Sequence, residues 1–483
     1  MGNNRGQITV FLCIVLTSIL LIGFTALERV RISMGSAKAA EAARGAVNDV
    51  RAAYNKPLFE RYHLLAIDKE FDGQGEGKIE QMVEDYLTYT LDNDQEDSMK
   101  VEQVALADCK GLLDNDCESM KEQIRQYMKE YVKEEGITDL LEMLTTERKA
   151  GEKSENAVKN GRNDTSEDEQ VWVGRDPRKV VRKMTRGGVL RCVVPAGKMP
   201  SADKLDLSDM PSKDKCKDSP EWEDIEFDDI DVFENSLRTD RDNVGTKITD
   251  NFYGICYVTE FLNNFTDEAQ DGVLKCEVEY IISGKSSDQE NLKGVVNRII
   301  LHRLPVNLAY LVSDKSKVSS VAPIAFVLSL IPGVTYPAAK YLLLGCWAYA
   351  ETLVDIKVLL SGHSVQFFKT DETWVTDIDN LGKLKSIENE DYEGADSINY
   401  KGYLSILLAE NTGNLYYRLA DIIQMNLSQD DEGFDIRNMI YGFSVDVDVS
   451  QKKKYAYFIE DQAGVDGIDK DMYRYVFRMT TSY

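Results

Sequence analysis

The sequence predicts an α-rich α+β protein with a long amino-terminal transmembrane and stem helix, a helical body and a small carboxy-terminal antiparallel sheet. Three observations predict this class. The amino end holds an uncharged apolar run, the middle of the chain repeats apolar residues at helical spacing, and the residues after about 440 alternate between apolar and polar.

The 483 residues include 83 acidic and 57 basic side chains, which gives a formal net charge of −26. Only Arg5 is charged among residues 1–27, so the whole acidic excess lies after residue 27. An acidic body repels polyanions, and we therefore expect no nucleic-acid partner. The length is sufficient for about two to four domains.

The apolar run at residues 8–27 contains no proline and no charge. As a helix it is about 30 Å long, the thickness of the hydrocarbon core of a bilayer. A secretory signal peptide has a shorter apolar core and a small-x-small cleavage site, whereas this run leads directly into Glu28-Arg29-Val30-Arg31. The run predicts a single-pass membrane anchor. Basic residues flank it on both sides, and the acidic body favours an extracellular location.

A stem helix is predicted to continue the anchor as far as Pro57, because apolar and small residues recur there at steps of three and four. They are Val30, Met34, Ala37, Ala40, Ala43, Val47, Val50 and Tyr54. Small residues allow another helix to approach closely. Two interpretations stay open: the stem packs on its own globular domain, or it packs laterally against copies or relatives.

Residues 58–144 are predicted as a helical membrane-proximal region, with helices at residues 79–91 and 119–132. Residues 145–245 are predicted as a charged, partly disordered linker or insertion. Within it, Arg178, Arg182 and Arg186 share one face of a basic helix that starts at Asp176-Pro177, and residues 218–234 form an acidic run. Pairing between the two, or solvation, is favoured over phosphate or nucleic-acid binding.

Residues 246–427 are predicted as a helical region with an apolar hairpin. Helices are expected at residues 247–261, 288–312, 404–408 and 415–427, and a short strand at residues 273–282. The uncharged stretch 318–339 contains Pro323, Pro332 and Pro337, which argue against one lipid-exposed span. We expect a buried hairpin with helices at residues 322–331 and 338–360.

Residues 428–483 are predicted as the antiparallel β region. Phe443, Val445, Val447 and Val449 alternate with polar residues, and residues 455–459 and 473–479 complete the expected sheet. At the other end of the chain, residues 1–6 form a short leader-like segment, and residues 7–57 are the transmembrane and stem helix.

Several patterns that could carry chemistry are weak. Gly284-Lys285-Ser286 resembles the end of a phosphate-binding loop, but Glu279 stands where the motif needs glycine. His63, His302 and His363 are scattered and lack partners at zinc spacing. A hydrolytic triad around Ser361 and His363 would lack the turn that exposes a nucleophile.

Glu351 and Asp355 are the strongest catalytic alternative, because they lie at i and i+4 on one apolar helix. Such a pair could serve as acid and base or hold a metal, but pairing with Lys or Arg is the commoner role. Six cysteines outside the apolar segments allow disulfides in an exported body. We predict no catalytic, cofactor-binding or metal-binding residue, and no cofactor.

The amino end, Arg5-Gly6-Gln7-Ile8-Thr9-Val10-Phe11 with the following apolar helix and residues 39–43, resembles the minor pilin-like proteins of tight-adherence (Tad) pilus systems. In that family a prepilin peptidase removes a short leader that ends in glycine, which implies cleavage after Gly6. The family's glutamate five residues into the mature chain is replaced by Phe11.

Four further segments, residues 54–68, 277–295, 347–362 and 369–374, are similar to an uncharacterised domain family of Gram-positive bacteria whose members tend to be encoded beside Tad pilus genes. The resemblance implies a Tad pilus context rather than a chemistry. Together with the apolar run at residues 8–27 and the small-residue stem face, it predicts a membrane-anchored, non-enzymatic structural or assembly component of a Tad-like pilus or secretion apparatus, with pilin-like partners. An anchored surface adhesin or sensor is the alternative, ahead of a surface hydrolase using Glu351 and Asp355.

Overall fold

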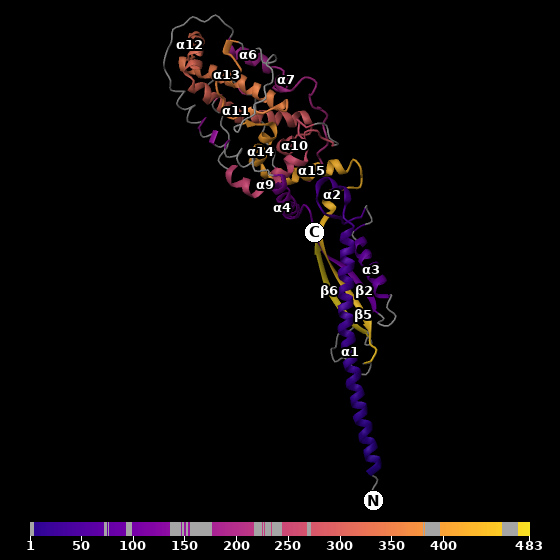
Figure 1. Ribbon diagram of the computed structural model, residues 1–483. Helices are drawn as coiled ribbons and strands as arrows, with labels where there is room; N and C mark the ends of the chain where they lie inside the picture. Colours follow the sequence, from indigo (N-terminus) through magenta and orange to yellow (C-terminus); the bar gives the residue numbers. More distant parts are fainter. Residues whose placement is uncertain are drawn as a thin grey trace. The chain divides into compact units, whose positions relative to one another are not determined.

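The computed structural model describes residues 4–71, 77–92, 99–135, 176–216, 244–267, 272–379, 397–455 and 472–483, with a few single positions between them (Figure 1). The fold is α-rich α+β, as predicted. Its contacts divide the chain into two compact units. The sheet unit comprises residues 1–123 and 430–483, and the helical unit comprises residues 124–429.

The sheet unit joins both ends of the chain around one central strand. Strand β5 (Met439–Lys452) pairs antiparallel with β2 (Met99–Gly111), with β6 (Met472–Ser482) and, at its start, with β1 (Ile67–Asp68). The other elements of this unit are α1 (Asn4–Ala52), α2 (Lys56–Tyr62), α3 (Gly77–Asp92), the start of α4 (Asp114–Glu135) and the short helix η3 (Ile436–Asn438).

The predicted alternation in β5 is confirmed. Phe443, Val445, Val447 and Val449 lie in the hydrophobic core beneath α1 and α3, because successive side chains of a strand point to opposite faces. On the opposite face Asp446 pairs with Arg478 and Asp448 with Arg474 of β6. Of the other predicted strands, residues 473–479 lie within β6, whereas residues 456–459 lie outside the described part of the chain.

The small residues of α1 serve close packing within the chain itself. Ala39, Ala43 and Ala46 are buried in the core that α1 shares with α3 and the sheet. A Cβ atom at Gly35 would lie 2.5 Å from Oε1 of Gln451, so only glycine fits there without displacing a neighbour. Of the two interpretations of the stem, the structure shows packing on its own domain for this part of the helix.

The lower part of the predicted stem face is wrong. Val30 is 57% exposed and Met34 is 65% exposed, and Ala37 is also exposed, whereas Ala43, Val47 and Val50 are buried as predicted. The reason is that the backbone at Lys454 and Tyr455, just after β5, contacts α1 at Glu28. The buried face of α1 therefore includes Glu28, Gly35 and Ala39, and Val30 lies on the exposed face.

Two further expectations are corrected. Residues 99–111 form strand β2 in a region for which only helices were predicted, and residues 273–282 include helix α10 (Glu277–Ser283) rather than a strand. Every side chain of α10 is buried, acidic ones included, so apolar periodicity carries no information about this segment. In β2, bulges interrupt the regular alternation.

The helical unit is built on two long antiparallel helices, α11 (Asp288–Ser313) and α13 (Tyr336–Leu360), against which the others pack. Its other elements are the rest of α4, α6 (Pro177–Thr185), α7 (Leu190–Val193), α9 (Val244–Phe261), α12 (Lys315–Ser329), α14 (Tyr400–Glu410), α15 (Leu415–Leu427), the short helix η2 (Thr412–Asn414), and strands β3 (Val365–Gln366) and β4 (Ser397–Ile398). The predicted helices at residues 79–91, 119–132, 247–261, 288–312, 404–408 and 415–427 are confirmed.

The apolar hairpin is confirmed, but its burial is only partly so: α12 (Lys315–Ser329) ends before the predicted residue 331, and Leu330 and Ile331 are 69% and 47% exposed. Helices α12 and α13 pack against each other, and the turn between them contains Gly333 with a positive φ of 91°. Thr335 caps α13 through its hydroxyl, which accepts a hydrogen bond from the amide of Ala338. Helix α13 is buried along almost its whole length by protein.

Residues 176–216, within the segment predicted as a partly disordered insertion, are ordered and are part of the helical unit. Asp176 caps α6 by accepting a hydrogen bond from the amide of Arg178, as the Asp-Pro start predicted. Farther along, the amide of Ser212 donates to Asp421 of α15. The acidic run 218–234 and the linker 145–165 lie almost entirely outside the described residues, so their pairing and disorder stay predictions.

Candidate functional site

The apolar half of α1 is the most unusual surface of the sheet unit. Its large side chains between residues 8 and 27 are exposed, Phe11 at 67% for example. Among the described residues this is the one helix that is long and apolar enough to cross a membrane. Exposed apolar surface of this extent marks contact with a bilayer or with other proteins, so this half of α1 is a candidate interaction site.

A rigid junction joins this apolar half to the sheet. Glu28, the first charged residue after the run, is only 2% exposed, and its carboxylate accepts hydrogen bonds from the amides of Lys454 (3.2 Å) and Tyr455 (2.9 Å). Arg31 donates to the carbonyl oxygen of Lys452 at 2.8 Å, and the ring of Phe24 stacks on Tyr455. The end of β5 is thereby fixed to the helix where its apolar run ends.

Replacing Glu28 by Ala is expected to lower the stability of the sheet unit by about 1–3 kcal/mol, because two backbone amides lose their carboxylate acceptor. Hydrogen exchange at residues 454 and 455 should become faster, and thermal unfolding of the full chain in detergent should shift to lower temperature. Glu41→Ala, on the exposed side of the same helix, is the matched control. Equal exchange in both variants would contradict the role of Glu28.

An exposed apolar stripe continues beyond Glu28 on the side of α1 that faces away from the sheet. It consists of Val30, Met34 and Ala37, which lie at helical spacing and are all exposed. The stripe extends the apolar surface of residues 8–27 past the first charged residues. It is therefore a candidate contact surface for a neighbouring helix.

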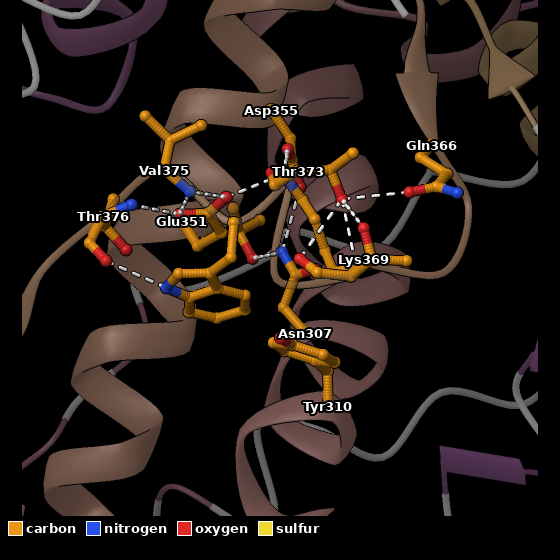
Figure 2. Close-up of polar contacts among 12 residues, drawn as sticks. Asn307, Tyr310, Glu351, Asp355, Gln366, Lys369, Thr373, Val375 and Thr376 are labelled. Atoms are coloured by element: carbon orange, nitrogen blue, oxygen red, sulfur yellow. Dashed lines mark hydrogen bonds and ion pairs between the residues drawn. The ribbon is translucent and has the colours of Figure 1, made fainter. Parts of the chain in front are cut away.

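Glu351 and Asp355 do lie on one face of α13, as their spacing predicted, and the structure gives both of them charged partners (Figure 2). Nζ of Lys369 lies 2.7 Å from Oε1 of Glu351 and 2.7 Å from Oδ1 of Asp355. Nε of Arg303, on α11, lies 2.7 Å from Oδ2 of Asp355. All four side chains are buried, so two positive charges compensate two negative charges.

Backbone groups complete this network. The amide of Thr376 donates to Oε2 of Glu351 at 2.9 Å, and the guanidinium of Arg303 donates to the carbonyl oxygens of Gln366 and Phe367. Burial opposes ionisation of Asp355, but Arg303 and Lys369 outweigh it and hold its pKa below the usual value. The network fastens the loop at residues 366–376 onto α11 and α13.

Neither carboxylate is therefore poised as a general base or a metal ligand. A catalytic pair needs one carboxyl group whose proton can move to a substrate, whereas both carboxylates here are held by charged and backbone donors. The sequence predicted pairing with Lys or Arg as the commoner role of such residues. It did not indicate Arg303 and Lys369, which are distant in sequence.

The remaining candidates also have local structural roles. Gly284 ends α10 in the left-handed conformation, with φ 67°, and His63 ends α2 in the same way. His302 lies 3.1 Å from Glu410. Among the residues that the structure describes, no group of three or more His, Cys, Asp or Glu side chains is arranged to hold a metal ion. All eight cysteines are described, and none forms a disulfide.

Glu279 on α10 is a fully buried acid, which the sequence did not indicate. Glu279 accepts hydrogen bonds through Oε1 from the hydroxyl of Tyr400 (2.7 Å) and the amide of Phe265 (2.9 Å). Its Oε2 has no hydrogen-bond partner in the described part of the chain. Burial raises the pKa of Glu279 from 4.5 to about 7.

Glu279 is expected to make the stability of the protein depend on pH. Because its pKa is higher in the folded state, the folded protein binds more protons between pH 4.5 and 7. Its contribution to stability should fall by about 1.4 kcal/mol for each pH unit over that range and stay low above pH 7. Glu279→Gln should therefore gain stability relative to wild type from pH 5 to pH 8 in denaturant unfolding, whereas the exposed control Glu372→Gln should not. A constant difference between Glu279→Gln and wild type would contradict this.

Together the fold and the apolar half of α1 define a class: an α-rich α+β protein whose amino-terminal helix is long and apolar enough to span a membrane. Comparison with protein families matches residues 167–451, more than half of the chain, to the family of unknown function DUF5702. The protein belongs to this family. Comparisons with curated proteins and with solved structures gave no match.

Proposed function

We propose that this protein is a membrane-anchored, non-enzymatic structural or assembly component of a Tad-like pilus or secretion apparatus on a Gram-positive cell surface. Helix α1 crosses the membrane once, and the body lies outside the cell. The observation that carries the proposal is the division of α1 into an exposed apolar half and a half that is buried against a sheet.

The anchoring part of the proposal follows from the physical chemistry of residues 8–27. These residues have no covering surface in the described chain, and a helix of this length satisfies its own backbone hydrogen bonds inside a bilayer. The junction at Glu28 makes the step from the apolar helix to the sheet rigid. The anchor is thus joined to the sheet unit by these contacts and not by a flexible linker.

The partner part of the proposal rests on the exposed stripe of Val30, Met34 and Ala37. These side chains lie outside the predicted span and on the side of α1 away from the sheet, so a helix from a pilin-like partner can pack along both the apolar run and the stripe. The resemblance of the amino end to Tad minor pilin-like proteins supports this choice of partner. Glu351 and Asp355 are the strongest catalytic alternative in the sequence, and both are paired with buried basic side chains. This supports a structural role for these two residues.

Membrane fractionation combined with protease treatment of intact cells tests the proposal. The full-length protein should sediment with membranes and resist alkaline extraction, and the body should be digested in intact cells while a cytoplasmic marker protein stays whole. A body that is protected in intact cells and digested only after lysis would overturn the extracellular orientation.

Site-specific crosslinking separates an assembly component from an adhesin or sensor. A photo-crosslinking residue at Met34 should form adducts with membrane-anchored pilin-like proteins in intact cells. The same residue at Lys110, which is exposed on β2 of the sheet unit, is the control. If neither position captures such a protein, the assembly role is wrong, and a role in binding a surface ligand is favoured instead.

A further inference from the structure

Strand β6 has an unpaired edge in the described part of the sheet unit. Its 11 residues pair with β5 on one side without a bulge, and no described strand pairs with its other side. Strand β2, at the opposite edge of the sheet, is interrupted by three register shifts. Bulges and prolines protect an edge from pairing with other chains, and β6 contains neither.

The pairing with β5 shows which backbone groups of β6 face this edge. Hydrogen-bonded and non-hydrogen-bonded pairs alternate along an antiparallel ladder. The amide of Tyr483 donates to the carbonyl oxygen of Tyr441 at 3.2 Å, so the odd-numbered residues of β6 direct their backbone groups towards β5. The even-numbered residues direct theirs outward. In agreement, the carbonyl oxygen of Ser482 accepts a hydrogen bond from Arg51 of α1 rather than from β5.

Four residues on the outward side remain available to another strand: Arg474, Val476, Arg478 and Thr480. No hydrogen bond joins their backbone amides and carbonyl groups to another described segment. Their side chains are exposed as well, Val476 at 70%. A row of unpaired backbone donors and acceptors on a regular edge is a template for one more strand.

The side chains beside the edge indicate which strand fits. On the face that packs against α1, Tyr473, Phe477 and Met479 are only partly buried, so apolar residues of an added strand would extend the core there. On the opposite face, Arg474 and Arg478 still expose 41% and 66% of their side chains, although each pairs with an aspartate of β5. Acidic residues opposite these arginines would form favourable cross-strand pairs.

We propose that the outward edge of β6 binds an extended segment of another protein, which adds to the sheet as a further strand. The segment has apolar residues towards α1 and acidic residues on the open face of the sheet. Its alternation of apolar and acidic residues matches the two rows of side chains that β6 presents. The backbone row supplies affinity, and the side chains supply selectivity.

A second copy of the chain is the less favourable occupant. Two β6 edges related by a two-fold axis would run antiparallel. Helix α1 runs along the sheet (Figure 1), so the two copies would then direct their apolar halves in opposite directions. Both anchors could not enter one membrane in the same orientation. This choice of occupant rests on the proposed anchor, whereas the availability of the edge does not.

Fluorescence anisotropy with the full chain in detergent tests this edge. The probe is a labelled synthetic peptide with the sequence of residues 442–451, in which apolar residues alternate with serine and aspartate. Wild type should bind it saturably, and a scrambled peptide should not bind. Val476→Pro should weaken binding about tenfold or more, because it removes an outward amide and places a ring at the edge. Thr480→Pro should weaken binding in the same way.

Val476→Thr is the matched control and should bind the peptide like wild type, since it keeps the backbone donor. Thermal unfolding of Val476→Pro should resemble that of wild type, because the amide of Val476 takes no part in the ladder with β5 and proline is tolerated at such a position. If wild type does not bind the peptide, or if both proline variants bind it equally well, the proposal is wrong.

The oligomeric state in the same detergent decides between the two occupants. Wild type should be monomeric without the peptide. A dimer that Val476→Pro abolishes would assign the edge to a second copy and would overturn the proposal. Because peptide binding is measured without a membrane, a body located inside the cell would overturn the proposed function and leave the binding result unchanged.

Discussion

Replacing both Leu16 and Ile19 by arginine is expected to release the protein from the membrane. Both residues lie within the apolar run of α1 and are exposed. Each arginine near the centre of a membrane helix raises the free energy of insertion by about 2.5–3.5 kcal/mol. The double substitution should therefore raise it by roughly 5–7 kcal/mol.

The measurement is the fraction of full-length protein that sediments with membranes and resists alkaline extraction. Val30→Arg is the matched control, because Val30 lies on the same helix with a similar exposure but after Glu28. This control should remain in the membrane fraction. If the double variant stays membrane-bound as wild type does, the apolar half of α1 is not the anchor.

Replacing Arg303 by Leu is expected to destabilise the helical unit by about 3–5 kcal/mol. Arg303 is fully buried and compensates Asp355, and it also holds the carbonyl oxygens of Gln366 and Phe367. Removing one partner of a buried ion pair leaves an uncompensated charge in a medium that solvates it poorly. Denaturant unfolding of the full chain in detergent measures the loss.

Tryptophan fluorescence reports this unfolding locally, since Trp347 and Trp374 both donate hydrogen bonds to Thr376 beside the network. Arg437→Leu is the control, because Arg437 pairs with Asp435 at a partly exposed site, where an ion pair contributes at most about 1 kcal/mol. A loss no larger than that of the control would show that Arg303 is dispensable.

The effect of Arg303→Leu should also depend on pH. The pKa of Asp355 is lowered in the folded state, so its ionised form stabilises the protein above the unfolded value of 3.8, and this contribution is lost as the pH falls through the lowered folded pKa. The difference in stability between wild type and Arg303→Leu should therefore be largest near neutral pH and should shrink in strong acid. An effect that does not change with pH would indicate lost packing rather than lost charge.

Local patterns predicted much of the fold. The hairpin of α12 and α13 followed from prolines that interrupt an apolar stretch, and β5 followed from strict alternation. Strand β2 and helix α10 were missed for opposite reasons. Bulges break the alternation of β2, and burial on all sides removes any polar face from α10.

The candidate sites divide in the same way. The apolar half of α1 was evident from composition, because a long uncharged run has few other uses. Glu351 and Asp355 were predicted to share a face, but their partners Arg303 and Lys369 come from other segments, which no local pattern connects.

By itself the sequence determined most of the long helices, the apolar run and the alternation of β5, since each depends on spacing within one segment. Only the tertiary structure decided that β5 pairs with β2 from the other end of the chain, that α1 turns Ala43 inward and Met34 outward, and that residues 176–216 belong to the helical unit. These outcomes depend on contacts between segments distant in sequence. The burial of a side chain is set by what packs against it, and local periodicity does not encode that.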